Sequence, residues 1–230
     1  MLEPFGPEIW IADGEPLTAA MGFHYPTRMT VIRLPGGGLV VISPIGLCGE
    51  MRSAVDALGP VQALVAPNSL HHMFMSDWVN RYPGATRIAA PGLARKRPDL
   101  SIDHTLDDTP VPGWGGTLDH VLVVGNAITT EAVFFHAPSG TAIFTDLLQQ
   151  LPPGWFTGWR AWVARRDLMM EPAPSVPRKF RAAFTNRALA RAAIRRILAW
   201  PAHRIVMAHG TPVTENGQAF LADAFGWLKP

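Results

Sequence analysis

Four side chains able to coordinate a metal ion occur at three separate places in the sequence. His71 and His72 are adjacent, and Asp146 and His209 lie far downstream. Imidazole nitrogens and carboxylate oxygens form a ligand set that zinc, iron and manganese accept. No pair among them has the spacing of a helical zinc motif such as HExxH, so the four become a site only if the fold brings them together.

Each of these residues also has a purely structural alternative. Adjacent histidines at the start of a helix can serve in packing and capping. Asp146 could cap a helix that begins at Leu147. His209, which precedes Gly-Thr-Pro, could be a histidine whose hydrogen bonds are satisfied within a turn. The sequence leaves these alternatives open.

Short apolar runs typical of buried strands precede all three places. They are Val61–Ala66 before the two histidines, Thr141–Thr145 before Asp146, and Arg204–Ala208 before His209. Ligands of α/β proteins bind beyond strand ends, so these are the positions where a site is expected. Three strand ends that converge on one rim would bring all four side chains together.

The rest of the chain alternates between strand and helix patterns, which indicates α/β layers. Further strands are predicted over Glu8–Ala12, Met29–Leu34, Leu39–Ser43, Thr86–Ala90, Leu118–Val124 and Glu131–His136. Helices are predicted over Glu50–Leu58, Leu70–Arg81, Leu93–Arg97, Asn186–Trp200 and Glu215–Leu228. Pro35–Gly38 predicts a hairpin turn, and Asn68 or Ser69 is the expected N-cap of the second helix.

The helix at Asn186–Trp200 is strongly amphipathic. Arginines recur at a spacing of four, at Arg187, Arg191 and Arg195, and are expected to face solvent. The predicted apolar stripe consists of Leu189, Ala190, Ala193, Ile194, Ile197 and Leu198.

Composition narrows the class of protein. Of the 230 residues, 48% are hydrophobic and 17% are charged, which permits a sizeable core and argues against disorder. The lone cysteine, Cys48, excludes an internal disulfide and cysteine-rich zinc sites, and we expect it to pack as a small buried hydrophobe. Neither a signal-peptide pattern nor a run of about 20 apolar residues is present, so we expect a cytoplasmic protein with no membrane partner.

Charge is distributed unevenly. Residues 1–150 contain 8 basic and 14 acidic residues, whereas residues 151–230 contain 12 basic and 4 acidic residues. A basic half can attract nucleic acid or an acidic partner. Because the arginines lie largely on one helical face, a solvated surface is the favoured interpretation and nucleic acid is disfavoured. A small-molecule substrate is the expected partner, and homo-oligomerisation stays open.

The order of these segments resembles the metallo-β-lactamase superfamily, whose fold is a four-layer αβ/βα sandwich. ALVAPNSLHHMF stands where that superfamily has its HxHxDH loop, with His71 and His72 in place of Asp-His. AIFTDLL resembles the superfamily's LFTGDLL and puts Asp146 at its metal-bridging aspartate. RIVMAHG resembles its final histidine strand and puts His209 there. Pro67, Asn68, Trp78, Tyr82 and Pro83 extend the resemblance to a bacterial branch with the motif PNxxHH…W…YP and no assigned substrate.

The departures from that superfamily concern its first metal site. Pro67 and Ser69 stand at the first two histidines of HxHxDH, and no histidine occurs near Gly125-Asn126, where the mid-chain histidine falls. The resemblance therefore implies a reduced site for one ion, drawn from the four candidate ligands. Within the adjacent pair, His72 is expected to be the better ligand because it occupies the superfamily's histidine position.

We expect two sheets packed face to face with helices outside, in one domain over residues 1–230. A Trp-, Arg- and Pro-rich insertion covers about 152–176. It is expected to narrow the mouth of the site as a lid, with Trp155 and Trp159 contacting substrate, although packing of a helix or hairpin is the simpler alternative.

Three functions follow from these patterns. The first is a metal-dependent hydrolase, in which one divalent ion, zinc ahead of iron or manganese, activates a water molecule that Asp146 helps to orient. The second is a non-catalytic scaffold or binding protein that keeps the fold with no metal. A basic module for an acidic partner is a third.

Overall fold

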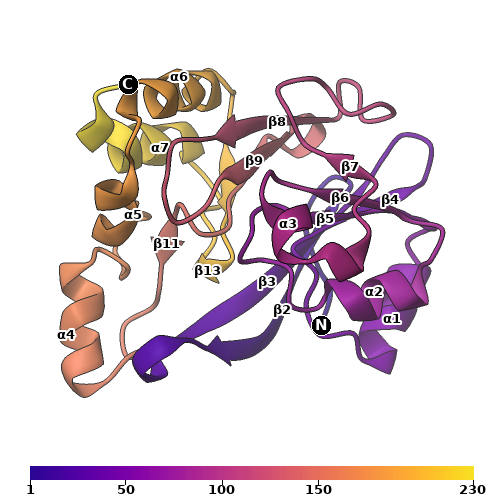
Figure 1. Ribbon diagram of the computed structural model, residues 1–230, viewed down its shortest axis with the longest axis horizontal. Coiled ribbons are helices and arrows are strands. Elements are labelled where there is room, and N and C mark those ends of the chain that lie inside the picture. The colour runs from indigo at the N-terminus through magenta and orange to yellow at the C-terminus, as the bar shows by residue number, and fades with distance from the viewer.

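Two β-sheets and two layers of helices make up the protein, as Figure 1 shows. The computed structural model describes all residues, 1–230. The larger sheet has seven strands in sequence order: β1 (Glu3–Gly6), β2 (Ile9–Thr18), β3 (His24–Arg33), β4 (Leu39–Ile42), β5 (Val61–Ala66), β6 (Thr86–Ala89) and β7 (His104–Thr105). The second sheet has the order β12 (Arg204–Val206), β10 (Thr141–Ile143), β9 (Glu131–His136) and β8 (Leu118–Val123). A short parallel pair, β11 (Gln149–Gln150) and β13 (His209–Gly210), lies beside the site described below.

The helices fall into two groups along the chain. Those of the first part are α1 (Gly49–Asp56), α2 (Met75–Arg81) and α3 (Leu93–Lys96). Those of the second part are α4 (Gly158–Arg166), α5 (Arg178–Ala183), α6 (Arg187–Leu198) and α7 (Gly217–Phe225). Short 3₁₀ segments lie at Ala20–Gly22, Pro98–Leu100, Ala137–Ser139 and Gly226–Leu228. None of the helices combines the length and the apolar character needed to cross a lipid bilayer.

Three apolar cores separate the four layers. Successive residues of a strand point to opposite faces, so one strand serves two cores. In β5, Val65 joins Phe134 of β9 in the core between the sheets, whereas Leu64 packs with Trp78 under the first group of helices. In β9, Phe135 belongs to the core under α6 and α7. The sheets therefore pack face to face with helices outside, as expected.

Most predicted strands are confirmed, and Val61–Ala66 and Glu131–His136 have the predicted bounds. The turn at Pro35–Gly38 joins β3 and β4 as an antiparallel hairpin. The main difference is the hairpin of β2 and β3, which extends over Ile9–Thr18 and His24–Arg33, well beyond the predicted runs. Its outer half is polar and rich in Gly and Pro, so no strand pattern marks it.

Three smaller expectations were wrong. The second helix begins at Met75 and not at Leu70, because the preceding residues form turns. Leu189 is 50% exposed, since the buried face of α6 consists of Ala190 and the residues three, four and seven positions after it. Cys48 is exposed, and its sulfur accepts a weak hydrogen bond from Met51 N at the start of α1.

Candidate metal centre

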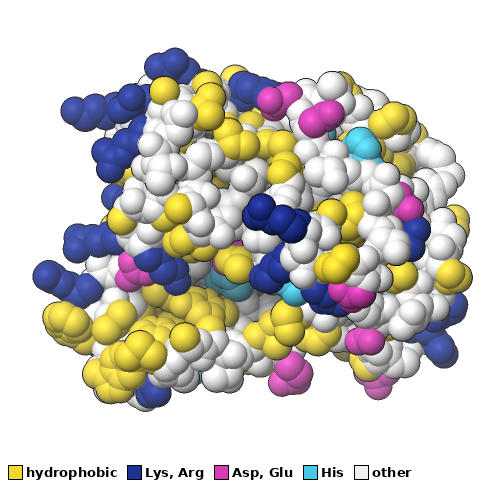
Figure 2. Space-filling view, viewed as in Figure 1, with side chains coloured by type: hydrophobic (Ala, Val, Ile, Leu, Met, Phe, Trp, Pro, Cys, Tyr) yellow, Lys and Arg dark blue, Asp and Glu magenta, His cyan; other side chains and the backbone are white.

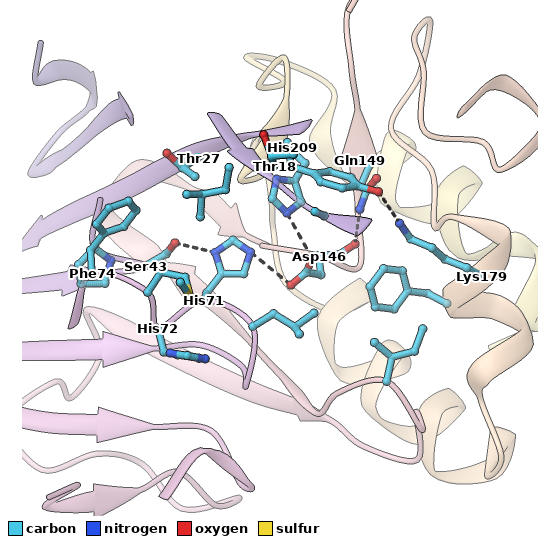
Figure 3. A pocket seen from close by; sticks show the side chains of 18 residues that line it. Thr18, Thr27, Ser43, His71, His72, Phe74, Asp146, Gln149, Lys179 and His209 are labelled. Carbon is cyan, nitrogen blue, oxygen red and sulfur yellow. Dashed lines mark hydrogen bonds and ion pairs between the residues drawn. The ribbon is translucent and has the colours of Figure 1, made fainter. Parts of the chain in front are cut away.

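Three of the four candidate ligands meet at one end of the sandwich. The ligand atoms of His71, Asp146 and His209 all lie within 4.8 Å of one another. The Nε2 atom of His71 is 3.2 Å from Oδ2 of Asp146, and the Nε2 atom of His209 is 3.2 Å from Oδ1. Figure 3 shows the two rings directed at the carboxylate from different sides.

The strand order explains why residues so distant in sequence meet. β10 and β12 are parallel neighbours, with Thr141 opposite Arg204, so their carboxyl ends lie at the same edge. Asp146 follows the first of these strands and His209 the second. His71 follows β5 of the other sheet across the turn 67–70. The site therefore joins the two sheets at one end of the sandwich.

Each histidine is held through its second ring nitrogen. Nδ1 of His209 lies 2.8 Å from the carbonyl oxygen of Pro26, and only a protonated nitrogen can donate to a carbonyl. Nδ1 of His71 lies 2.8 Å from Oγ of Ser43. Ser43 stands at the end of β4 with a φ of 55°, which turns the backbone out of the strand. Because Nδ1 of His209 is committed to Pro26, Nε2 is the nitrogen that faces Asp146 and that would be offered to a metal ion.

Asn68 connects the histidine turn to Asp146. Its buried amide nitrogen donates to Oδ2 of Asp146 at 2.7 Å and to Oγ1 of Thr145 at 3.0 Å. Its carbonyl oxygen accepts from the backbone N–H groups of Leu70 and His71, at 2.8 and 3.0 Å. The sequence predicted Asn68 as a cap, and it caps this turn rather than a helix.

A buried carboxylate on β9 holds the loop that carries Asp146. Glu131 is 0% exposed and accepts the backbone N–H groups of Thr145, Asp146 and Leu147 at 2.8 to 3.1 Å. It also accepts from the Asn68 amide at 3.3 Å. All of these partners are donors, which suits a carboxylate. Nothing in the sequence distinguishes this glutamate from a surface residue, because its function depends on the loop folding back over it.

The charges at the centre are strongly coupled. Burial opposes the ionisation of Asp146, but the charge and hydrogen bonds of the two histidines prevail and hold its pKa well below the usual range. Burial likewise opposes the protonation of His71, but Asp146 outweighs it and raises the pKa of His71. Burial and the nearby Asp146 carboxylate raise the pKa of Glu131 to about 7, against its backbone hydrogen bonds. Asp146, whose carboxylate lies between the two imidazoles, therefore stays ionised.

The expectation that His72 is the better ligand of the pair is wrong for this geometry. His72 points away from Asp146 and accepts a hydrogen bond from Arg97 at its Nδ1 atom, at 3.0 Å. Burial, together with the charges of Lys96 and Arg97, lowers the pKa of His72. Adjacent side chains diverge in a turn, so only one of the two histidines can face Asp146. The hydrogen bond from Arg97 holds His72 in the other direction.

The centre opens into a cavity of about 400 Å³. Its wall includes all four candidate ligands, and Leu70, Met73 and Ile128 lie at the mouth, where each is more than a third exposed. Figure 2 shows histidine atoms at the bottom of a hollow in this face, with apolar side chains around it.

Neither Trp155 nor Trp159 lines this cavity, so the expected substrate contacts are absent. The indole N–H of Trp155 donates to the backbone carbonyl of His24 at 2.9 Å, and the ring of Trp159 packs on Phe23. The insertion thus packs on the tip of the β2–β3 hairpin, where Figure 1 shows α4 beside it. Tyr25 lies between the insertion and the centre, because it touches both Phe156 and His209.

Comparisons with known proteins agree with this architecture. The chain is similar to the metallo-β-lactamase FIM-1 from Pseudomonas aeruginosa in its mono-zinc form, with 13% identity and a TM-score of 0.63 over 100% of this chain and 96% of that one. It is similar to a metallo-β-lactamase from Pontibacter korlensis, with 17% identity and a TM-score of 0.63 over 100% and 98%. The metal-soaked Flv1 flavodiiron core from Synechocystis sp. PCC6803 gives 12% identity and a TM-score of 0.66, over 100% of this chain and 60% of that one. At these identities the likeness shows the fold alone.

A search of curated proteins gives no match. A family model described as a domain of unknown function (DUF4336) matches residues 8–159, about two thirds of the chain. The protein therefore has the metallo-β-lactamase fold and belongs to the DUF4336 family.

Proposed function

We propose that the protein is a metal-dependent hydrolase with a single divalent ion held by His71, Asp146 and His209. The observation that carries the proposal is the convergence of three ligand atoms within 4.8 Å at the bottom of a cavity. Three protein ligands with an open fourth position are the usual arrangement of a catalytic zinc site. Zinc is the favoured ion for two imidazoles and one carboxylate, with iron and manganese as alternatives.

The donor set passes a simple test of fit. In a tetrahedral site with bonds of about 2.1 Å, neighbouring ligand atoms are about 3.4 Å apart. The two N···O distances of 3.2 Å, one to each oxygen of Asp146, are close to that value, and all the ligand atoms lie within 4.8 Å of one another. Both histidines have their other nitrogen fixed by Ser43 or Pro26, as metal-ligating histidines usually do. One structural neighbour is a mono-zinc form, so this fold accommodates a single ion.

A bound ion would lower the pKa of a water molecule toward neutrality and so supply a hydroxide nucleophile. The protein's own side chains would orient this water molecule and exclude bulk solvent. Asn68 anchors Asp146 through Oδ2, and Oδ1, which lies beside Nε2 of His209, is the oxygen that would orient a water molecule. The apolar cavity wall excludes bulk water from the reacting group.

The competing function is a non-catalytic scaffold, and one observation favours it. Asp146 already has hydrogen-bonding partners on both oxygens, so the cluster is also complete as a polar network. Metal analysis of the freshly purified chain distinguishes the two. We expect about one equivalent of metal in the parent protein and less than a tenth in Asp146→Ala and His209→Ala, together with hydrolysis of a panel of ester, amide and phosphoester substrates that these variants lose. Parent protein that contains no metal, and takes up none from added Zn²⁺, Mn²⁺ or Fe²⁺, would establish the scaffold instead.

A further inference from the structure

The wall of the cavity next to His209 carries a pair of polar groups that the metal centre does not use. Lys179, on α5, donates from Nζ to the hydroxyl of Tyr25 at 3.0 Å. The ring of Tyr25 lies against His209, with the ring centres 5.3 Å apart. Lys179 is the only lysine or arginine among the residues that line the cavity, and Figure 3 shows it reaching toward this wall.

This pair keeps donors for a further partner. The ammonium group has three N–H donors, and Tyr25 takes one of them. Its one carboxylate neighbour is Asp167, whose Oδ2 lies 4.0 Å away, at the limit of an ion pair. Because the tyrosine oxygen accepts from lysine, its own O–H proton remains available. The wall therefore offers an N–H and an O–H side by side, which matches the two oxygens of a carboxylate.

The remainder of the cavity suits an apolar chain. Leu70, Met73 and Ile128, which are 39%, 58% and 41% exposed, line its mouth. Exposed apolar groups gathered around one cavity indicate a binding surface rather than a solvated one. A single cation, partly offset by Asp167, is better matched to a monoanion than to a phosphate dianion.

We propose that the cavity binds an amphipathic monocarboxylate, with the carboxylate on Lys179 and Tyr25 and the apolar chain along Leu70, Met73 and Ile128. What this binding implies for the substrate rests on the proposed hydrolase function. The substrate is then an ester or amide that carries both a carboxylate and an apolar chain, placed with its scissile bond between these two ends at the metal centre. Lys179 and Tyr25 determine specificity through binding.

The test measures binding alone, by isothermal titration calorimetry on the full chain treated with a chelator, so that bonding of a carboxylate to metal cannot contribute. The probes are hexanoate, octanoate, decanoate and decanol. We expect decanoate to bind about tenfold more tightly than decanol, because the charged head is paired. Each added methylene that is buried should tighten binding by roughly three- to fourfold.

Variants locate the carboxylate. Lys179→Met should remove most of the preference for decanoate over decanol, and Tyr25→Phe, which keeps the ring on His209, should reduce it by about threefold. Lys96→Met is the matched control, because Lys96 is exposed, bonds to the carbonyl of Ser69 and does not line the cavity. It should leave the preference unchanged.

Equal binding of decanoate and decanol, no dependence on chain length, or a preference that survives Lys179→Met would each overturn the inference. These outcomes are independent of the hydrolase. A chain that takes up no metal can still show the Lys179-dependent preference, and a metal-loaded, active chain can fail to show it.

Discussion

Replacing Asn68 by alanine tests whether one buried amide holds the metal centre together. The side chain has five hydrogen-bonding partners: its two N–H groups are shared among Asp146, Thr145 and Glu131, and its oxygen accepts from the backbone N–H groups of Leu70 and His71. Each buried hydrogen bond is worth about 1 kcal/mol net, and water entering the space restores part of the loss, so we expect the free energy of unfolding to fall by about 3 kcal/mol. Urea denaturation followed by tryptophan fluorescence measures this change.

The same substitution should weaken metal binding in the folded chain. Without the amide, Oδ2 of Asp146 loses its 2.7 Å partner and the turn that presents His71 loses its cap. Removing a group that orients a metal ligand costs about 10- to 100-fold in affinity. We expect that loss in a zinc titration against a competing chelator.

Asn126→Ala is the matched control for Asn68→Ala. Asn126 is also buried, donates to the carbonyl of Phe180 at 2.9 Å and accepts from Ile128 N at 3.0 Å, but it makes no contact with Asp146. It should lose stability while retaining zinc affinity. If Asn68→Ala and Asn126→Ala lowered stability alike and left zinc affinity the same, the argument that Asn68 positions the ligands would be refuted.

Three further predictions follow from the geometry. His71→Gln should abolish zinc uptake in a metal assay whereas His72→Gln should retain it, and the reverse result would restore the interpretation based on the sequence resemblance. Burial lowers the pKa of His136 from 6.5 to about 4, so the unfolded chain binds a proton there before the folded chain does as the pH falls. The free energy of unfolding should therefore drop by about 2 kcal/mol between pH 7 and pH 4.5. In His136→Gln, measured by the same urea denaturation, this dependence on pH should be flatter. The side chains of Trp159 and Trp162 are 49% and 63% exposed and lie outside the cavity. Trp159→Ala and Trp162→Ala should therefore leave the affinity for decanoate within twofold in calorimetry. A larger loss of affinity would indicate that these side chains act as a lid.

The sequence predicts the site best where local pattern and general topology agree. Continuous apolar runs such as Val61–Ala66 predict buried strands. Residues just beyond the carboxyl ends of neighbouring parallel strands lie at the same edge of their sheet. Those two rules place Asp146 near His209, because β10 and β12 are parallel neighbours, whereas His71 approaches from the other sheet. The prediction that Asn68 acts as a cap is confirmed in part. Its oxygen accepts from the backbone N–H groups two and three positions later, although these belong to a turn and not to a helix.

Prediction failed where the outcome depends on residues far away in sequence. His72 leaves the centre because Arg97, 25 positions later, offers its guanidinium. Glu131 supports Asp146 from a neighbouring strand, and Tyr25 reaches His209 from a hairpin whose polar outer half carries no strand pattern. Trp155 and its neighbours were expected over the cavity, but the long hairpin gives them a nearer apolar surface to cover. Each of these outcomes is decided by a tertiary contact, which spacing along the chain does not encode.

The position of the ligands ties metal binding to the packing of the two sheets. His71 follows a strand of the seven-stranded sheet, whereas Asp146 and His209 follow strands of the other, and Asn68 links the two loops. The unfolded chain has no such arrangement, so an ion that binds only the folded state stabilises the whole sandwich in proportion to its affinity. The charge balance supports the same coupling, because an ion held by the two imidazoles would place its positive charge beside the Asp146 carboxylate. A centre of this kind contributes to stability whether or not it turns over a substrate, which is why metal content and hydrolysis must be measured separately.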